Sequence, residues 1–209
     1  MTPELEKYAE EHTTPELPVL TSLNRETHLS QVYPRMLSGH LQGTLLRLIS
    51  IMLKPLRILE IGTFTGYSAI CLASGMRDKG ILHTIDADPE LREIIIRYIG
   101  EAGLIGKVIL HTGEALEVIP ELDETWDLVF IDADKPNYLT YYKMVFDRVR
   151  KGGIILADNA LWDGKVLNPV TRSKDTKGII EFNEFVQKDE RVENLLLPVR
   201  DGLMIIRKN

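Results

Sequence analysis

The sequence LVFIDADK, residues 128–135, is a short apolar run that ends in charged side chains, and GIILADN, residues 153–159, ends in an acid and an amide. Runs this apolar are typical of buried strands in a parallel sheet. Because ligands of open α/β sheets bind at the carboxyl ends of strands, both ends are expected to line one crevice. For either end alone a turn cap is the favoured interpretation, but two equivalent ends favour a site for a hard cation such as Mg²⁺. The side chains that these ends supply are Asp132, Lys135, Asp158 and Asn159.

Outward from these runs, strand and helix patterns alternate along most of the chain. Strands are expected at residues 57–61, 81–86, 107–111, 126–132, 153–158, 193–199 and 203–207. Helices are expected at residues 38–53, from about 66, and at 89–102, 115–119, 138–149 and 179–188. Repeated strand–helix units predict an α/β fold, a Rossmann-like, doubly wound, mostly parallel sheet of about seven strands. Asp201-Gly202 is a hairpin signal, so the last two strands are expected to form an antiparallel C-terminal hairpin.

The length and the N-terminal region predict a single domain with a helical cap. A chain of 209 residues fits one domain, taken as residues 1–209. Prolines at 15, 18 and 34 divide the beginning of the chain, and residues 1–37 are expected to form an N-terminal helical cap segment. In the helix at 38–53, apolar positions 41, 45, 48, 49 and 52 share one face, which suits either core burial or a homodimer contact.

Composition and charge argue against several classes of protein. The formal net charge is −6 and no long basic run is present, which weighs against broad, non-specific nucleic-acid binding. The single cysteine, Cys71, lies in an apolar stretch and predicts a buried thiol without an internal disulfide. The acidic N-terminus resembles neither a signal peptide nor a transit peptide, and the most apolar helix is too short to span a bilayer. A soluble cytoplasmic protein without membrane contact is expected.

A glycine turn follows the first expected strand, in LEIGTFTGYS at residues 59–68. Its G-x-x-x-G spacing, Gly62 to Gly66, departs from the dinucleotide fingerprint G-x-G-x-x-G, and no P-loop is present. A pyrophosphate ligand is therefore disfavoured. Glu60 beside the turn suits a cationic ligand group instead.

An acidic residue ends the second expected strand and completes a nucleoside pattern. An acid about 20 residues beyond such a turn typically binds a ribose diol, and Asp86 holds this place. A ligand with an adenosyl group but no pyrophosphate fits both features. S-adenosylmethionine (SAM) matches this description, because it has a ribose, an adenine, an amino-acid end and a sulfonium.

The longer motifs resemble one family closely. The matching pieces are LEIGTFTGYSA, HTIDADPE, HTGEAL, FIDADKPNYLTYY, GGIILADNALWDGKV and DGLMIIRK, which occur in the family's order from Met36 onward. On these motifs the chain is similar to the cation-dependent O-methyltransferases, the group that includes catechol and caffeoyl-CoA O-methyltransferases. The resemblance implies the class I methyltransferase fold, SAM as methyl donor, and a divalent cation, with Mg²⁺ favoured over Ca²⁺ or Mn²⁺.

The family pattern also implies roles for individual residues. It implies that Asp132, Asp158 and Asn159 bind the metal. It implies that Lys135 is the catalytic base, and Asp163 falls where plant members place a substrate-contacting asparagine. Cofactor contacts are implied at Ser38, Glu60, Gly62, Thr63, Ser68, Asp86, Ala115 and Asp132.

The expected reaction is an in-line attack of a substrate oxygen on the sulfonium methyl group. A phenol is a poor nucleophile while neutral, and coordination to a metal favours the phenolate. The preferred acceptor is a catechol-like hydroxylated aromatic molecule. An alternative within the same family is 5-hydroxyuridine in tRNA, against which the acidic net charge counts modestly. A nicotinamide-dependent oxidoreductase and a non-catalytic binding protein are more remote alternatives.

Overall fold

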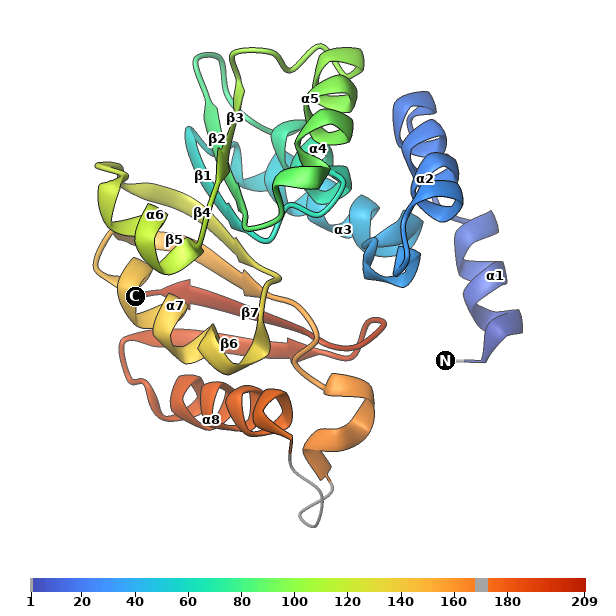
Figure 1. Cartoon of the computed structure of the whole chain (residues 1–209). Coiled ribbons are helices and arrows are strands. Elements are labelled where there is room, and N and C mark those ends of the chain that lie inside the picture. Colours follow the sequence, from blue (N-terminus) through green and yellow to red (C-terminus); the bar gives the residue numbers. More distant parts are fainter. Residues whose placement is uncertain (1, 168–172) are drawn as a thin grey trace.

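A seven-stranded sheet forms the centre of the computed structural model, which describes residues 2–167 and 173–209 (Figure 1). Its strands are β1 (Arg57–Ile61), β2 (Ile81–Asp86), β3 (Val108–Thr112), β4 (Trp126–Ile131), β5 (Val149–Ala157), β6 (Val192–Leu197) and β7 (Leu203–Lys208). The strand order is β3-β2-β1-β4-β5-β7-β6, with β7 antiparallel to both β5 and β6 and the other pairs parallel. The doubly wound sheet and its antiparallel C-terminal hairpin are therefore confirmed.

Helices cover both faces of this sheet and also form the N-terminal segment. The α-helices are α1 (Pro3–Glu11), α2 (Pro18–Ser30), α3 (Gly39–Leu53), α4 (Tyr67–Ala73), α5 (Arg92–Glu101), α6 (Ala115–Glu121), α7 (Tyr138–Phe146) and α8 (Lys174–Lys188). Short 3₁₀ turns are η1 (Pro34–Met36), η2 (Pro89–Leu91), η3 (Lys135–Asn137) and η4 (Trp162–Leu167). No helix in the described residues is long and apolar enough to cross a membrane.

Two apolar cores lie on opposite faces of the sheet. Leu59 of β1 and Val129 of β4 belong to the core beneath α6, α7 and α8. Their neighbours Ile58 and Leu128 belong to the core beneath α3, α4 and α5. Successive strand residues point to opposite faces, so a sheet that is covered on both faces needs apolar side chains at every position. This is the physical reason for the continuous apolar runs in the sequence.

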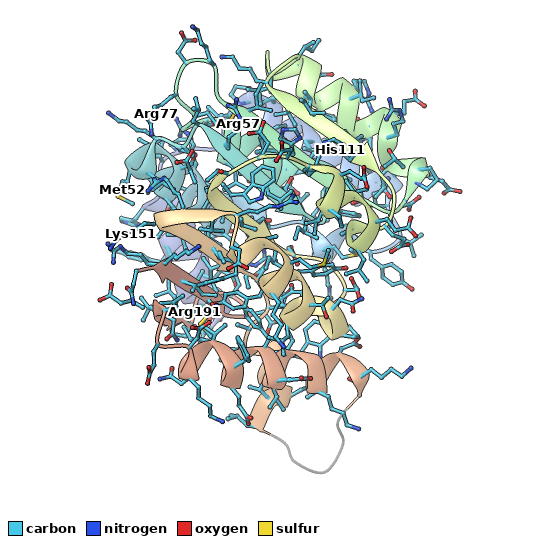
Figure 2. The ribbon with its side chains drawn as sticks, turned by 90° about the vertical axis from the view of Figure 1, so that its left-hand side faces the viewer. Met52, Arg57, Arg77, His111, Lys151 and Arg191 are labelled. Atoms are coloured by element: carbon cyan, nitrogen blue, oxygen red, sulfur yellow. The ribbon has the colours of Figure 1, made fainter. Side chains whose placement is uncertain are left out.

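The buried face of α3 differs from the apolar face that the sequence offered. The structure buries Gln42, Gly43, Leu46 and Ser50, whereas Leu48 and Met52 are exposed. Figure 2 shows Met52 at the outside of the molecule. A Cβ at Gly43 would meet the Tyr67 ring at 2.5 Å, and the Ser50 hydroxyl donates to the Leu72 carbonyl at 2.5 Å. Small residues thus let α3 approach α4 closely, which periodicity alone does not reveal. Leu45 and Ile49 of the predicted face pack partly against the core, so the expected core burial holds for only part of that face.

Several element ends also differ from the expected ones. β5 begins at Val149 rather than 153, because Val149 pairs with Trp126 across a register shift in β4. α7 consequently ends at Phe146 rather than at 149. β6 ends at Leu197 rather than 199, where Pro198 supplies no N–H to the ladder. α8 begins at Lys174 rather than 179.

The N-terminal cap segment lies against α4, α5 and the glycine turn. Its α2 is joined to the turn by a buried hydrogen bond from the Thr27 hydroxyl to the Thr65 hydroxyl, at 3.0 Å. The loop before α2 is joined to α4 by the Tyr67 hydroxyl, which donates to Glu16 at 2.5 Å. The helices expected in this segment are present as α1 and α2, and the contact of α2 with Thr65 supports the turn that follows β1.

Candidate active site

The ends of β1, β4 and β5 meet at one edge of the sheet. The Asp132 N–H donates to the Ile61 carbonyl at 2.8 Å, and the Asp158 N–H donates to the Ile131 carbonyl at 3.0 Å. The strand order reverses direction between β1 and β4, which is where ligands of such sheets bind. The two acidic strand ends are thus neighbours, as their sequence pattern predicts.

Asp158 is an almost fully buried carboxylate that is held from two sides. Its Oδ2 accepts from Gln42 Nε2 at 2.6 Å, and its Oδ1 accepts from the Asn159 N–H at 2.8 Å. Burial, followed by the negative charge of Asp132, raises the pKa of Asp158 to about 7. The site therefore concentrates negative charge that a cation would neutralise.

Asn159 is fixed by the loop between β6 and β7. Its backbone has φ 56°, a left-handed conformation that asparagine tolerates better than most residues. Its side-chain Nδ2 donates to Asp201 Oδ2 at 3.2 Å. The amide NH₂ group is thus bonded to Asp201, and the amide oxygen is the atom that could contact a bound cation.

Lys135 lies inside the site, with only 8% of its surface exposed. Its Nζ donates to Asp132 Oδ1 at 3.0 Å and to the Tyr138 hydroxyl at 2.7 Å. The neighbouring Asp134 instead accepts hydrogen bonds from Tyr141 and Asn137. The ammonium group therefore belongs to the carboxylate cluster and is not a solvated surface charge.

The glycine turn after β1 packs directly on Asp132. Gly62 has φ +96°, and a Cβ there would overlap the backbone carbonyl of Asp132. Gly66, with φ +94°, begins α4 in a left-handed conformation. Glycine is required at position 62 both for its backbone angle and for this close approach. The turn that is expected to bind the cofactor thus shares Asp132 with the oxygen-ligand cluster.

Glu60 is a fully buried carboxylate with one unsatisfied oxygen. Its Oε2 accepts from the Thr84 hydroxyl at 2.5 Å, while Oε1 has no hydrogen-bond partner among the described residues. Burial raises the pKa of Glu60 to about 8, against hydrogen bonds from Ser68 and Thr84 that lower it, and the charges of Asp132 and Asp86 add to the rise. An orphaned carboxylate oxygen beside a glycine turn fits a ligand that carries a positive group.

Asp86 supports the turn from the end of β2. Its Oδ2 accepts from the N–H groups of Thr63 and Phe64 at 3.1 and 2.7 Å, and its Oδ1 accepts from the Asp88 N–H at 2.9 Å. Burial raises the pKa of this carboxyl above its usual value. Carboxylate oxygens accept more than one hydrogen bond, so Asp86 also retains capacity for a diol.

The remaining predicted site residues fall into two groups. Ser38, Ser68 and Ala115 are buried and lie next to the first turns of α3, α4 and α6. Asp163 differs, because its side chain is 86% exposed and lies 3.9 Å from Lys165. Its backbone N–H donates to Asp201, so the peptide rather than the carboxylate joins the cluster.

Gln42 and Asp201 contact the predicted ligands and were not recognised in the sequence. Gln42 lies 116 residues from Asp158, and Asp201 lies 42 residues from Asn159. The local signal for Gln42 is a polar side chain in a mostly apolar helix, a signal that Arg47 and Ser50 share. For Asp201 the sequence indicates only a turn residue before Gly202.

The donor set suits a divalent cation, provided that the amide takes part. In residues 2–167 and 173–209 there is no cluster of three or more His, Cys, Asp or Glu side chains that could bind a metal. A cation bound between Asp132 and Asp158 would therefore take the oxygen of Asn159 as its third protein ligand. Two carboxylates and an amide oxygen are the hard ligands that Mg²⁺, Ca²⁺ and Mn²⁺ prefer.

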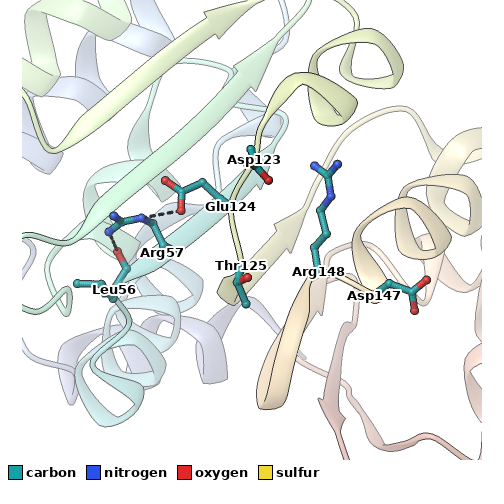
Figure 3. A pocket seen from close by; sticks show the side chains of 7 residues that line it. All are labelled: Leu56, Arg57, Asp123, Glu124, Thr125, Asp147 and Arg148. Atoms are coloured by element: carbon teal, nitrogen blue, oxygen red, sulfur yellow. Dashed lines mark hydrogen bonds and ion pairs between the residues drawn. The ribbon is translucent and has the colours of Figure 1, made fainter.

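A separate pocket of about 500 Å³ lies at the amino ends of β1, β4 and β5 (Figure 3). Figure 3 shows Arg57 paired with Glu124 at 2.9 Å in this pocket. Arg57 and Lys151, near the starts of β1 and β5, also mark this side of the molecule in Figure 2. The pocket is distant from the candidate site because parallel strands carry their two ends to opposite edges.

Known proteins share both the sequence and the fold of this chain. Caffeoyl-CoA O-methyltransferase 5 of Nicotiana tabacum is 34% identical over 181 residues, which cover 80% of this chain and 75% of the relative. Caffeoyl-CoA O-methyltransferase 2 of Petunia hybrida is 35% identical over 181 residues, covering 80% and 74%.

Solved structures agree over nearly the whole chain. The O-methyltransferase TomG of Streptomyces achromogenes, in complex with SAM, is 28% identical with a TM-score of 0.92, covering 99% of this chain and 96% of the other. An O-methyltransferase of Bacillus cereus with SAH is 27% identical with a TM-score of 0.92, covering 99% and 97%. The O-methyltransferase family profile matches residues 10–209. The expected family is thereby confirmed, and the chain belongs to the O-methyltransferase family.

Proposed function

We propose that this protein transfers the methyl group of SAM to a hydroxyl of a catechol-like aromatic molecule, with the help of a divalent cation. The observation that carries this proposal is the position of Asp132. Its backbone carbonyl packs on Gly62 of the glycine turn, its side chain pairs with Lys135 at 3.0 Å, and its negative charge helps to raise the pKa of the neighbouring Asp158. Methyl donor and metal would therefore lie side by side.

Two carboxylates are suited to the methyl donor. Glu60 has a buried oxygen without a described partner and would pair with the α-ammonium group of SAM. Asp86, which already supports the turn, would accept from the ribose hydroxyls. TomG and the Bacillus cereus enzyme, which share this fold, were solved with SAM and SAH.

The oxygen ligands would come from the ends of β4 and β5. Asp132, Asp158 and Asn159 form the donor set, and three protein ligands leave positions for a chelating substrate. When bound, a divalent cation would supply Lewis acidity and a template for the hydroxyl. Asp132 and Asp158 bring the negative charge that holds the cation, and Asn159 completes the set without adding charge.

Lys135 is placed to handle the proton of the hydroxyl. Its Nζ lies 3.0 Å from Asp132 Oδ1, within the cluster and largely out of water. After giving its own ammonium proton to solvent, Nζ would accept the hydroxyl proton while the oxygen attacks the methyl group and SAH leaves. Tyr138, whose hydroxyl is 2.7 Å from Nζ, fixes the position of the amine. Holding both reactants in line would supply a large part of the rate enhancement.

A small aromatic acceptor is supported by the plant relatives, which are named caffeoyl-CoA O-methyltransferases. None of the relatives described above carries a name that points to tRNA, so the tRNA alternative gains no support. Membership of the O-methyltransferase family argues against the nicotinamide alternative. The exposed Asp163 is proposed to face the substrate through its loop. A homodimer and a cytoplasmic location stay predictions.

The experiment is a radiolabelled methyl-transfer assay with catechol, in Mg²⁺ and in EDTA. Turnover should require Mg²⁺ and should be lost in Asp158→Ala. The matched control is Asp123→Ala, which removes an aspartate from the pocket at the opposite edge and should keep wild-type turnover. Hypomodified tRNA is assayed in parallel as acceptor. Undiminished methylation in EDTA, or equal activity of the two variants, would refute the metal-dependent reaction.

A further inference from the structure

An amide side chain has two chemically different ends, and Asn159 must present the correct one. Its oxygen can ligate a hard cation, whereas its NH₂ group is a donor only. The two ends have nearly the same shape, so the neighbours decide the orientation. At this site the deciding neighbour is Asp201, whose Oδ2 accepts from Asn159 Nδ2 at 3.2 Å.

Asp201 is itself held rigidly against the loop after β5. Its Oδ1 accepts from the Asp163 N–H, and its backbone carbonyl accepts from the Leu161 N–H at 2.8 Å. The Gly202 carbonyl accepts from the Ala160 N–H at 2.9 Å. Both carboxylate oxygens of Asp201 are therefore occupied by donors from residues 159–163. An ionised carboxylate can only accept, so it excludes the reversed amide.

We propose that Asp201 is a positioning residue that holds the Asn159 amide with its oxygen toward the cation site. This assignment rests on the proposed metal-dependent function. In this assignment Asp201 is not itself a ligand of the cation and acts on the cation site through Asn159. Partners of this kind typically contribute about 10- to 100-fold to metal affinity.

The isosteric change Asp201→Asn is the sharpest perturbation of this contact. The new amide can satisfy the Asp163 N–H with its oxygen, and it then presents NH₂ to Asn159. Asn159 must turn its own oxygen toward position 201, which directs its NH₂ group at the cation site. We expect Mn²⁺ affinity to fall by about 10- to 100-fold, although the shape of the side chain is unchanged.

A second change restores the pairing with donor and acceptor exchanged. In the Asn159→Asp variant two carboxylates face each other. Adding Asp201→Asn gives position 201 an NH₂ group, which can donate to the carboxylate at position 159. It should therefore leave Mn²⁺ affinity unchanged or raise it. A mere loss of negative charge would instead weaken binding in both backgrounds. The double-mutant cycle thus separates orientation from electrostatics.

The experiment measures Mn²⁺ binding to the full-length chain by electron paramagnetic resonance, without substrate. Wild type, both single variants, the double variant and Asp158→Ala are compared, with SAH affinity as the check that each is folded. The proposal is supported when Asp201→Asn weakens binding only in the Asn159 background. Equal effects in both backgrounds, or none in either, would overturn it. Absence of Mn²⁺ binding by the wild type, or wild-type affinity in Asp158→Ala, would instead overturn the proposed metal site and this assignment with it.

Discussion

Glu60 should make cofactor binding depend on pH, because its carboxyl is buried before the ligand arrives. Its pKa of about 8 means that about one tenth of the free protein carries the ionised form at pH 7 and about one hundredth at pH 6. If the α-ammonium group of the ligand pairs with the ionised form, binding must release a proton. Affinity then falls as the pH falls below 8.

The size of the effect follows from those fractions. The Kd for SAH should be about tenfold weaker at pH 6 than at pH 7, and about fiftyfold weaker at pH 6 than at pH 8. At pH 7 binding should release about 0.9 proton. Glu60→Gln should abolish this slope and weaken binding at pH 8 by about 10- to 100-fold, because a charge-assisted hydrogen bond is lost.

Isothermal titration calorimetry with SAH between pH 6 and 8, in buffers of different ionisation enthalpy, gives both the Kd and the proton count. EDTA is present throughout, so that no metal contributes. Burial and the charge of Asp132 also raise the pKa of Asp158, which belongs to the proposed metal site and not to the ammonium site, so Asp158→Asn is the control and should keep the slope. A Kd independent of pH, or a Glu60→Gln profile parallel to the wild type, would show that Glu60 does not pair with the ligand.

Three further predictions address the base, the turn and the fold. Lys135→Met should lower kcat by about 10²- to 10⁴-fold and leave SAH affinity unchanged, and a kcat within threefold of wild type would exclude a base role. Gly62→Ala should abolish SAH binding because its Cβ overlaps the carbonyl of Asp132. The control Gly103→Ala has φ +69° and no neighbour within 4 Å, so it should bind SAH normally and lose about 1 kcal/mol of folding stability. Asp127→Ala should lower the free energy of unfolding in urea by about 2–5 kcal/mol. The Asp127 carboxylate accepts from two backbone N–H groups at the start of β1, at 2.7 and 2.9 Å, and the substitution removes this acceptor. A loss below about 0.5 kcal/mol would show that water replaces it.

The strands could be predicted from the sequence, because a strand that is buried on both faces is apolar at successive positions. The run at 128–131 is apolar at every position, and all four residues are fully buried in the sheet. The handedness of strand–helix–strand units then brings the carboxyl ends of β4 and β5 together. The carboxylates of Asp132 and Asp158 were therefore predicted as neighbours without any knowledge of their contacts.

The face of α3 that is buried could not be predicted from the sequence in the same way. Its apolar stripe is the pattern that normally marks a buried face, yet the structure exposes much of that stripe. The buried face contains Gly43 and Ser50, whose small size lets the helix approach α4. Hydrophobic periodicity detects apolar surface, whereas close helix packing selects for small volume.

The sequence by itself determined the α/β fold, the edge of the sheet that carries the candidate site and the kinds of side chain that line this edge. All three follow from local apolar runs and from general rules of chain connection. Only the tertiary structure decided how those side chains are oriented. Asp201 meets Asn159 across 42 residues and Gln42 meets Asp158 across 116. Glu60 acquires its raised pKa from complete burial. Such contacts depend on the register of neighbouring strands and the approach of separate helices, and no local pattern in the chain encodes them.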